Sequence, residues 1–184
     1  QFIYTSRQDA LYVNLFTASE LNWKAKGVVL RQETAFPYDE TSKITIAKGK
    51  GQFKLLVRYP GWVKPGDFKV SVNGKPVTLI TGPSSYVCID RQWKKGDVVD
   101  VTFPMHNSIK YLPNTPQYIA IMHGPVLLGM KTGTEDLAHL VADDSRFGKY
   151  ASGKKLPVDK APILINNDIE SIATQLTPIP GKPL

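Results

Sequence analysis

The chain of 184 residues is long enough to bury one sizeable hydrophobic core, or one core and a smaller second unit. A hydrophobic fraction of 42% and a charged fraction of 21% argue against a disordered or fibrous chain. No apolar run reaches the roughly 18 to 20 residues that span a bilayer, so no membrane partner is expected. The chain starts at Gln1 without a signal-peptide pattern, which predicts a cut or processed chain whose ends do not reveal its compartment.

A net charge of +7 and a pI near 9.4 raise the question of nucleic acid as a partner. Nucleic-acid binding favours basic residues gathered on one face, whereas the lysines of this sequence are spread along the chain. The densest groups, such as 48–50, 94–95 and 154–155, lie beside glycines in predicted turns. We therefore expect solvated turn lysines and no nucleic-acid partner.

Short segments rich in β-branched and aromatic residues recur between turn signals, which predicts an all-β fold, an antiparallel β-sandwich of jelly-roll-like type. The predicted strands are 11–16, 28–34, 43–47, 53–59, 68–72, 75–79, 86–90, 98–103, 118–122 and 126–130. Alternation along 53–59 places Phe53, Leu55 and Val57 on one face, which we expect to meet the core.

The strongest local signal is Asn73-Gly74, since both residues accept the positive φ angles of a two-residue hairpin turn. Pro76 follows in the second strand of this hairpin and cannot donate to a ladder. Its strand is therefore expected to lie at the edge of a sheet or to point the Pro76 nitrogen outward.

Both ends of the chain depart from the strand pattern. Residues 1–8 lack alternation and are predicted to be the stub of a helix that lies upstream. Residues 9–131 are assigned to the sandwich, and 132–184 to a long connection followed by a smaller, truncated β-containing C-terminal unit. Within it, a turn of helix is predicted at 135–140. A second short helix is expected after Asn167 or Asp168, with its apolar face formed by Ile169, Ile172 and Leu176.

The residues that most often carry catalysis or bind metals are sparse. Cys88 is the only cysteine, which excludes an internal disulfide, and its place in a predicted strand suggests a small buried side chain. The three histidines, His106, His123 and His139, accompany no nucleophile motif. We therefore assign no catalytic residue, no metal site and no cofactor to this chain.

Two residue classes leave a carbohydrate function open. Paired carboxylates serve glycoside hydrolysis only when they lie about 5 to 10 Å apart, which spacing in sequence does not determine. The candidates are Glu20, Glu33, Asp39 and Glu40. Three tryptophans, Trp23, Trp62 and Trp93, could stack on sugar rings, although packing in the core is the commoner role for such residues.

Several motifs together resemble, in order, the β-sandwich that follows the catalytic barrel of β-L-arabinofuranosidase-type glycosidases, glycoside hydrolase family 127. They extend over roughly 3–130. These motifs are Tyr12-Val13-Asn14-Leu15-Phe16 with Ser19-Glu20-Leu21, Gln32-Glu33-Thr34 with Phe36-Pro37-Tyr38, Arg58-Tyr59-Pro60-Gly61-Trp62, Val72-Asn73-Gly74-Lys75-Pro76, Trp93-Lys94-Lys95-Gly96-Asp97 and His123-Gly124-Pro125-Val126.

The resemblance implies an upstream (α/α)₆ barrel in which a cysteine nucleophile near a zinc ion works with glutamates. None of these residues maps onto this chain, and Cys88 does not match the nucleophile. The expected function is thus a non-catalytic accessory sandwich that packs on the barrel of a periplasmic or secreted glycoside hydrolase. Two alternatives stay open: an independent carbohydrate-binding module, and an interaction sandwich unrelated to enzymes.

Overall fold

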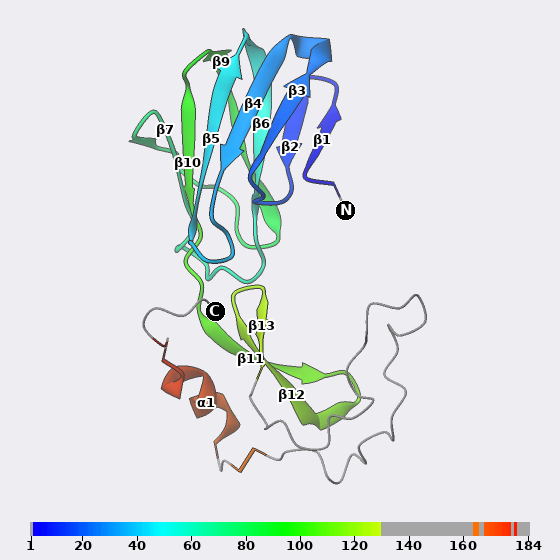
Figure 1. Ribbon diagram of the computed structural model, residues 1–184, viewed down its shortest axis with the longest axis vertical. Helices are drawn as coiled ribbons and strands as arrows, with labels where there is room; N and C mark the ends of the chain where they lie inside the picture. Colours follow the sequence, from blue (N-terminus) through cyan, green and yellow to red (C-terminus); the bar gives the residue numbers. More distant parts are fainter. Residues whose placement is uncertain (1, 130–163, 166–167, 178, 180–184) are drawn as a thin grey trace, which may run out of the picture.

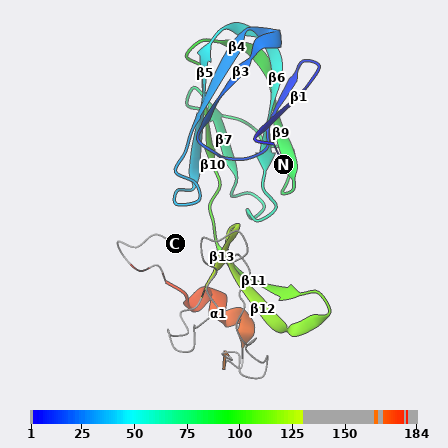
Figure 2. The same cartoon turned by 45° about the vertical axis from the view of Figure 1, so that its right-hand side comes forward.

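The computed structural model describes residues 2–129, 164–165, 168–177 and 179 (Figure 1). Two sheets face each other in the larger unit, and a third sheet with a helix forms a smaller unit at one end of it (Figures 1 and 2). This arrangement confirms the predicted all-β sandwich. Over the described ranges, no helix is long and apolar enough to cross a membrane.

The first sheet contains four strands, and one prediction for it was wrong. In spatial order they are β1 (Tyr4–Arg7), β2 (Ala10–Val13), β6 (Lys50–Tyr59) and β9 (Ser85–Lys94). Within the helical stub expected at 1–8, Tyr4–Arg7 instead form a strand, and Gln8, with a φ of 51°, turns this strand back onto β2 as a hairpin. The pair β2 and β6 is parallel, whereas the other neighbours in this sheet are antiparallel.

The second sheet contains six strands. In order they are β3 (Ser19–Trp23), β4 (Val28–Glu33), β5 (Thr41–Lys48), β10 (Val98–Thr102), β7 (Lys69–Val72) and β8 (Lys75–Pro76), and the 3₁₀ turn η1 (Lys24–Lys26) joins β3 to β4. Asn73 and Gly74 adopt φ angles of 51° and 77°, which confirms the two-residue turn. Strand β8 lies at the sheet edge, as the missing N–H of Pro76 predicted.

The core lies between these two sheets. Phe53, Leu55 and Val57 from β6 are at most 1% exposed, which confirms the predicted inward face. Ile44 and Ile46 from β5 are buried to the same degree in the opposing sheet. Each fully buried apolar side chain stabilises the fold by roughly 1.5 to 3 kcal/mol, so this alternation fixes the register of both sheets.

The smaller unit revises the expected boundary at residue 131. Strands β11 (Asn107–Leu112), β12 (Thr115–His123) and β13 (Val126–Leu128) form a sheet of their own. The strands expected in the sandwich at 118–122 and 126–130 therefore correspond to β12 and β13 of the second unit, of which β13 ends at Leu128. Pro104, just after β10, has no N–H to continue a ladder, and the strands that follow pair as consecutive hairpins.

Helix α1 (Ile169–Gln175) packs beside β11. Its predicted cap is confirmed, since the Ser171 amide donates to the Asp168 carboxylate at 3.4 Å, and Ile172 is buried as predicted. The Asn107 side-chain amide donates to the Ala173 carbonyl at 3.0 Å and so ties the helix to the sheet. The helical turn predicted at 135–140 and the alternative cap Asn167 lie outside the described residues.

Candidate functional site

The three tryptophans do not form a common platform. Trp93 is fully buried, and its indole Nε1 donates to the Phe53 carbonyl at 3.0 Å. Trp23 is 8% exposed and meets the ring of Phe53 edge-on at 5.4 Å. Both side chains therefore belong to the core, which leaves neither ring face for a sugar.

Trp62 is half-buried and contacts different rings from the other two tryptophans. Its ring stacks on Phe36, with 6.1 Å between ring centroids and 12° between planes, and meets Phe103 edge-on. Tyr38, two residues after Phe36, is 68% exposed. Of the three tryptophans, Trp62 alone remains a candidate for contact with carbohydrate.

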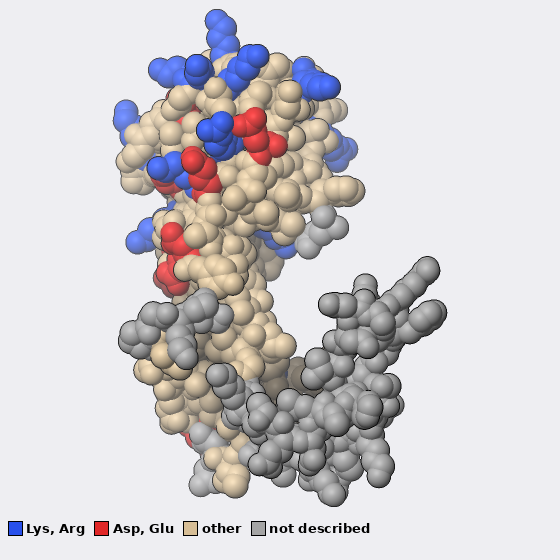
Figure 3. Space-filling view, in the orientation of Figure 1, with Lys and Arg blue, Asp and Glu red and all other residues tan. Residues whose placement is uncertain are grey.

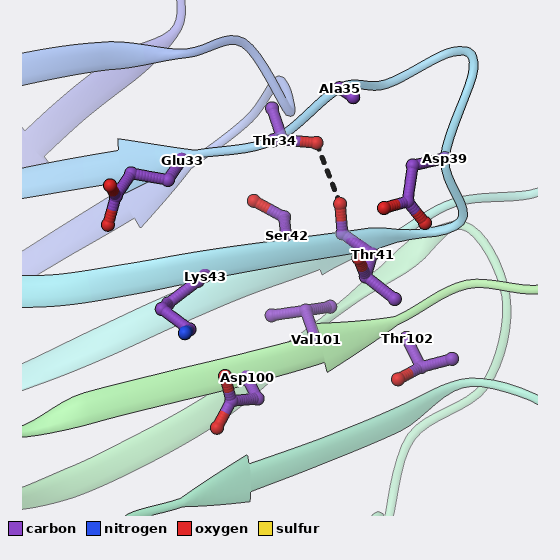
Figure 4. Close-up of a pocket in the computed structure, with 10 residues that line it drawn as sticks. All are labelled: Glu33, Thr34, Ala35, Asp39, Thr41, Ser42, Lys43, Asp100, Val101 and Thr102. Atoms are coloured by element: carbon purple, nitrogen blue, oxygen red, sulfur yellow. Dashed lines mark hydrogen bonds between the residues drawn. The ribbon is translucent and has the colours of Figure 1, made fainter.

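An open depression of about 480 Å³ lies over β4, β5 and β10 (Figure 4). Its lining comprises Glu33, Thr34, Ala35, Asp39, Thr41, Ser42, Lys43, Asp100, Val101 and Thr102. Across the sheet, Glu33 is the register partner of Lys43, and Lys43 is the partner of Asp100, so acid, base and acid form one row. At the rim of the depression, the Thr34 hydroxyl donates to the Thr41 carbonyl at 2.7 Å and connects the end of β4 to the start of β5. This row offers hydrogen-bonding groups to polar ligands.

The four candidate carboxylates do not converge. Glu33 and Asp39 both line the depression, but Glu20 forms an exposed ion pair with Arg31 at 3.1 Å. Glu40 accepts a hydrogen bond from the Met105 amide at 2.7 Å, next to the junction between the two units. Glu40 therefore holds the backbone after β10, and only two of the four carboxylates share a site.

The histidines have separate surroundings. His123 Nδ1 lies 2.8 Å from Asn107 Oδ1. The Asn107 amide nitrogen donates to a carbonyl of the helix, so the Asn107 oxygen is the atom that faces His123 and accepts from it. His123 is therefore assigned the tautomer with its proton on Nδ1. Burial lowers the pKa of His106, and the nearby positive charge of Lys64 lowers it further. His139 lies outside the described residues.

The expectation that Cys88 is buried was wrong. Val87 and Ile89 point into the core, so the alternation of β9 turns Cys88 outward, where it is exposed opposite Leu56. In the described part of the chain, no group of three or more His, Cys, Asp or Glu residues could hold a metal ion. The surroundings of Cys88 thus do not fit the zinc ion that the resemblance implies for the barrel.

The outer surface of the four-stranded sheet carries a cluster that the sequence analysis missed, which we call the tyrosine–arginine face: Tyr12, Asn14, Arg58 and Tyr86. The rings of Tyr12 and Tyr86 meet edge-on at 5.3 Å, and the Arg58 guanidinium lies 5.8 Å from the Tyr86 ring centroid. The Tyr86 hydroxyl donates to Asn14 Oδ1 at 2.8 Å. All four side chains are half-buried, and each residue follows or precedes a core residue in the sequence, which was the available signal for an outward side chain.

The fold defines an all-β sandwich, and the comparisons identify its family. Residues 10–105, more than half of the chain, match the family model of the β-L-arabinofuranosidase, GH127 middle domain. The chain therefore belongs to the GH127 β-L-arabinofuranosidase family. Residues 108–184 match a domain of unknown function, so the two matches divide the chain where β11 begins a new sheet.

Solved structures agree with this assignment. A GH127 β-arabinofuranosidase, BT3674, is 33% identical with a TM-score of 0.59, over 68% of this chain and 23% of its own. A glycoside hydrolase is 31% identical with a TM-score of 0.60, over 67% and 22%. The GH127 β-L-arabinofuranosidase Ara127N from Geobacillus stearothermophilus T6 is 29% identical with a TM-score of 0.59, over 68% and 21%.

The chain thus spans less than a quarter of the length of each of these three structures. A search of curated proteins finds no match.

Proposed function

We propose that this chain is a non-catalytic accessory region of a β-L-arabinofuranosidase-like glycoside hydrolase. The observation that carries the proposal is the match of residues 10–105 to the middle domain of the GH127 family. The same residues form a two-sheet sandwich around one core. In this proposal the catalytic cysteine, the glutamates and the zinc ion all belong to a separate barrel, and export to the periplasm or beyond follows from the family.

The tyrosine–arginine face is the surface that we assign to contact with the barrel. Tyrosine and arginine are enriched at the centres of protein interfaces, where large and rigid side chains become fully desolvated. Asn14 also donates from its side-chain amide to the Phe2 carbonyl at 3.2 Å, next to β1. A domain preceding β1 would therefore join the chain beside this face.

A pair of variants tests this contact in the whole protein, barrel included. Tyr12→Ala with Tyr86→Ala should lower the melting temperature of the whole protein by several degrees more than it lowers that of the 184-residue chain. The matched control is Tyr38→Ala with Tyr111→Ala, which removes two exposed tyrosines elsewhere. Equal losses in the whole protein and in the chain would show that the face has no barrel partner.

The alternative of an independent carbohydrate-binding module rests on the depression beside Lys43 and on Trp62. Titration calorimetry of the chain with neutral arabino-oligosaccharides distinguishes the two proposals. An accessory region that acts only by packing gives no heat of binding. Saturable heat that Trp62→Ala or Lys43→Ala removes would favour the binding module. A gene that encodes no helical barrel upstream would instead favour an interaction sandwich.

A further inference from the structure

Three turns of the sandwich gather lysines that are far apart in the sequence. We call this group the basic end: Lys24 and Lys26 in η1, Lys48 and Lys50 around the β5–β6 turn, and Lys94 and Lys95 in the β9–β10 turn. Figure 3 shows basic side chains gathered at the end of the sandwich remote from β11 to β13. These lysines are spread along the sequence, and the fold brings them together.

Direct contacts join the three turns. Gly49 packs so closely on the η1 turn that a Cβ placed on it would lie 2.2 Å from the Gly27 carbonyl oxygen. The Gly96 amide donates to the Ile46 carbonyl at 2.9 Å, which fastens the β9–β10 turn to the end of β5. Lys50 and Lys94 are direct register partners on neighbouring strands. The six lysines therefore lie on one continuous surface.

Few acidic side chains neutralise the charge of these lysines. Lys26 bonds to Asp9, but none of the other five lysines has an ion pair within 4 Å among the residues that the structure describes. Asp97 lies in the β9–β10 turn, yet its carboxylate is 1% exposed. Like charges directly opposite each other, such as Lys50 and Lys94, destabilise a sheet pair. An anionic ligand across these turns would offset that repulsion.

We propose that the basic end binds an acidic polysaccharide, a chain of sugars that carry carboxylate groups. Lysine ammonium groups are compact charges with three donors each, which suits carboxylates flanked by hydroxyls. Nucleic acid fits less well because its binding surfaces combine arginine with exposed aromatic rings. Here Trp23 and Trp93 adjoin the turns but are buried. The choice of a polysaccharide rests on the proposed function in a glycoside hydrolase.

Affinity electrophoresis of the 184-residue chain in gels containing polygalacturonate tests this proposal. We expect the native chain to be retarded at low salt, with retardation lost as salt rises, and a neutral arabinan gel to have no effect. Lys48→Gln with Lys50→Gln and Lys94→Gln should weaken retardation at least tenfold. The control is Lys64→Gln with Lys69→Gln and Lys110→Gln, which removes the same charge from exposed lysines elsewhere and should change retardation less than twofold.

Circular dichroism establishes that both triple variants are folded. Equal effects of the two triple variants would overturn the proposal, because net charge alone would then explain retention. Tighter binding of a single-stranded DNA of matched charge, lost in the same turn variant, would overturn it in favour of nucleic acid. Neither result bears on hydrolysis, so failure here is distinct from failure of the proposed function.

Discussion

A hydrogen bond between the side chains of Asn73 and Asp97 connects the β7–β8 hairpin to the β9–β10 turn. The Asn73 side-chain amide donates to Asp97 Oδ1 at 2.8 Å, while the Lys94 backbone amide donates to Oδ2 at 2.9 Å. The Val98 amide in turn donates to Asn73 Oδ1 at 2.8 Å. The two side chains thus complete one hydrogen-bonded unit beneath the basic end.

Asp97→Asn should destabilise the chain by about 3 kcal/mol, because its amide nitrogen must face one of the two donors that the carboxylate now satisfies. Urea unfolding at pH 7 measures the loss. Asp90→Asn, at an exposed aspartate of β9, is the matched control and should cost less than about 0.5 kcal/mol. Similar costs at both positions would contradict this account of Asp97.

The same carboxylate should make stability depend on pH. Burial alone would raise the pKa of Asp97, but the hydrogen bonds from Asn73 and Lys94 and the charge of Arg91 outweigh it and lower that pKa. Its stabilisation is therefore present above the unfolded value of about 3.9 and is lost as pH falls through the lower folded value. The stability gap between the native chain and Asp97→Asn should shrink between pH 7 and pH 3; an unchanged gap would count against the lowered pKa.

Gly49 should tolerate no side chain. Its φ of 88° disfavours other residues, and a Cβ would collide with the backbone of Gly27. We expect Gly49→Ala to lower the free energy of unfolding by at least about 2 kcal/mol. Gly51→Ala is the control, since a Cβ there meets nothing within 4 Å, and its effect should stay under about 1 kcal/mol. Urea unfolding of the two variants measures both losses, and a loss for Gly51→Ala as large as that for Gly49→Ala would contradict the prediction.

Trp93 and Trp62 should respond differently to replacement by phenylalanine. Trp93→Phe leaves a buried gap and removes the donor to the Phe53 carbonyl, which should cost about 2 to 3 kcal/mol. Trp62→Phe alters a half-buried ring and should cost about 1 kcal/mol or less. Chemical denaturation compares them, and a larger loss at Trp62 would show that the core is wrongly placed.

Some of these features could be predicted because they depend on local chemistry. Asn73-Gly74 specifies its own turn, and alternation in β6 separates its buried face. The hairpin of β1 was missed because Tyr4–Arg7 is short and mostly exposed, so little hydrophobic alternation marks it. Cys88 was assigned to the wrong face although its neighbours Val87 and Ile89 gave the register.

Sites that depend on tertiary structure gave no such signal. Lys50 and Lys94 are 44 positions apart, and only the pairing of β6 with β9 brings them opposite each other. The tyrosine–arginine face likewise joins β2, β6 and β9, which sequence spacing does not reveal. The family motifs nevertheless include Tyr12, Asn14 and Arg58 of this face.

The central claim, a family member without its own catalysis, is tested most directly by hydrolysis. The purified, folded chain is incubated with an aryl β-L-arabinofuranoside, and release of the aryl group is measured against a heat-unfolded control. We expect no release above that control at any chain concentration. Release that rises in proportion to the folded chain and persists through a second purification would contradict the account.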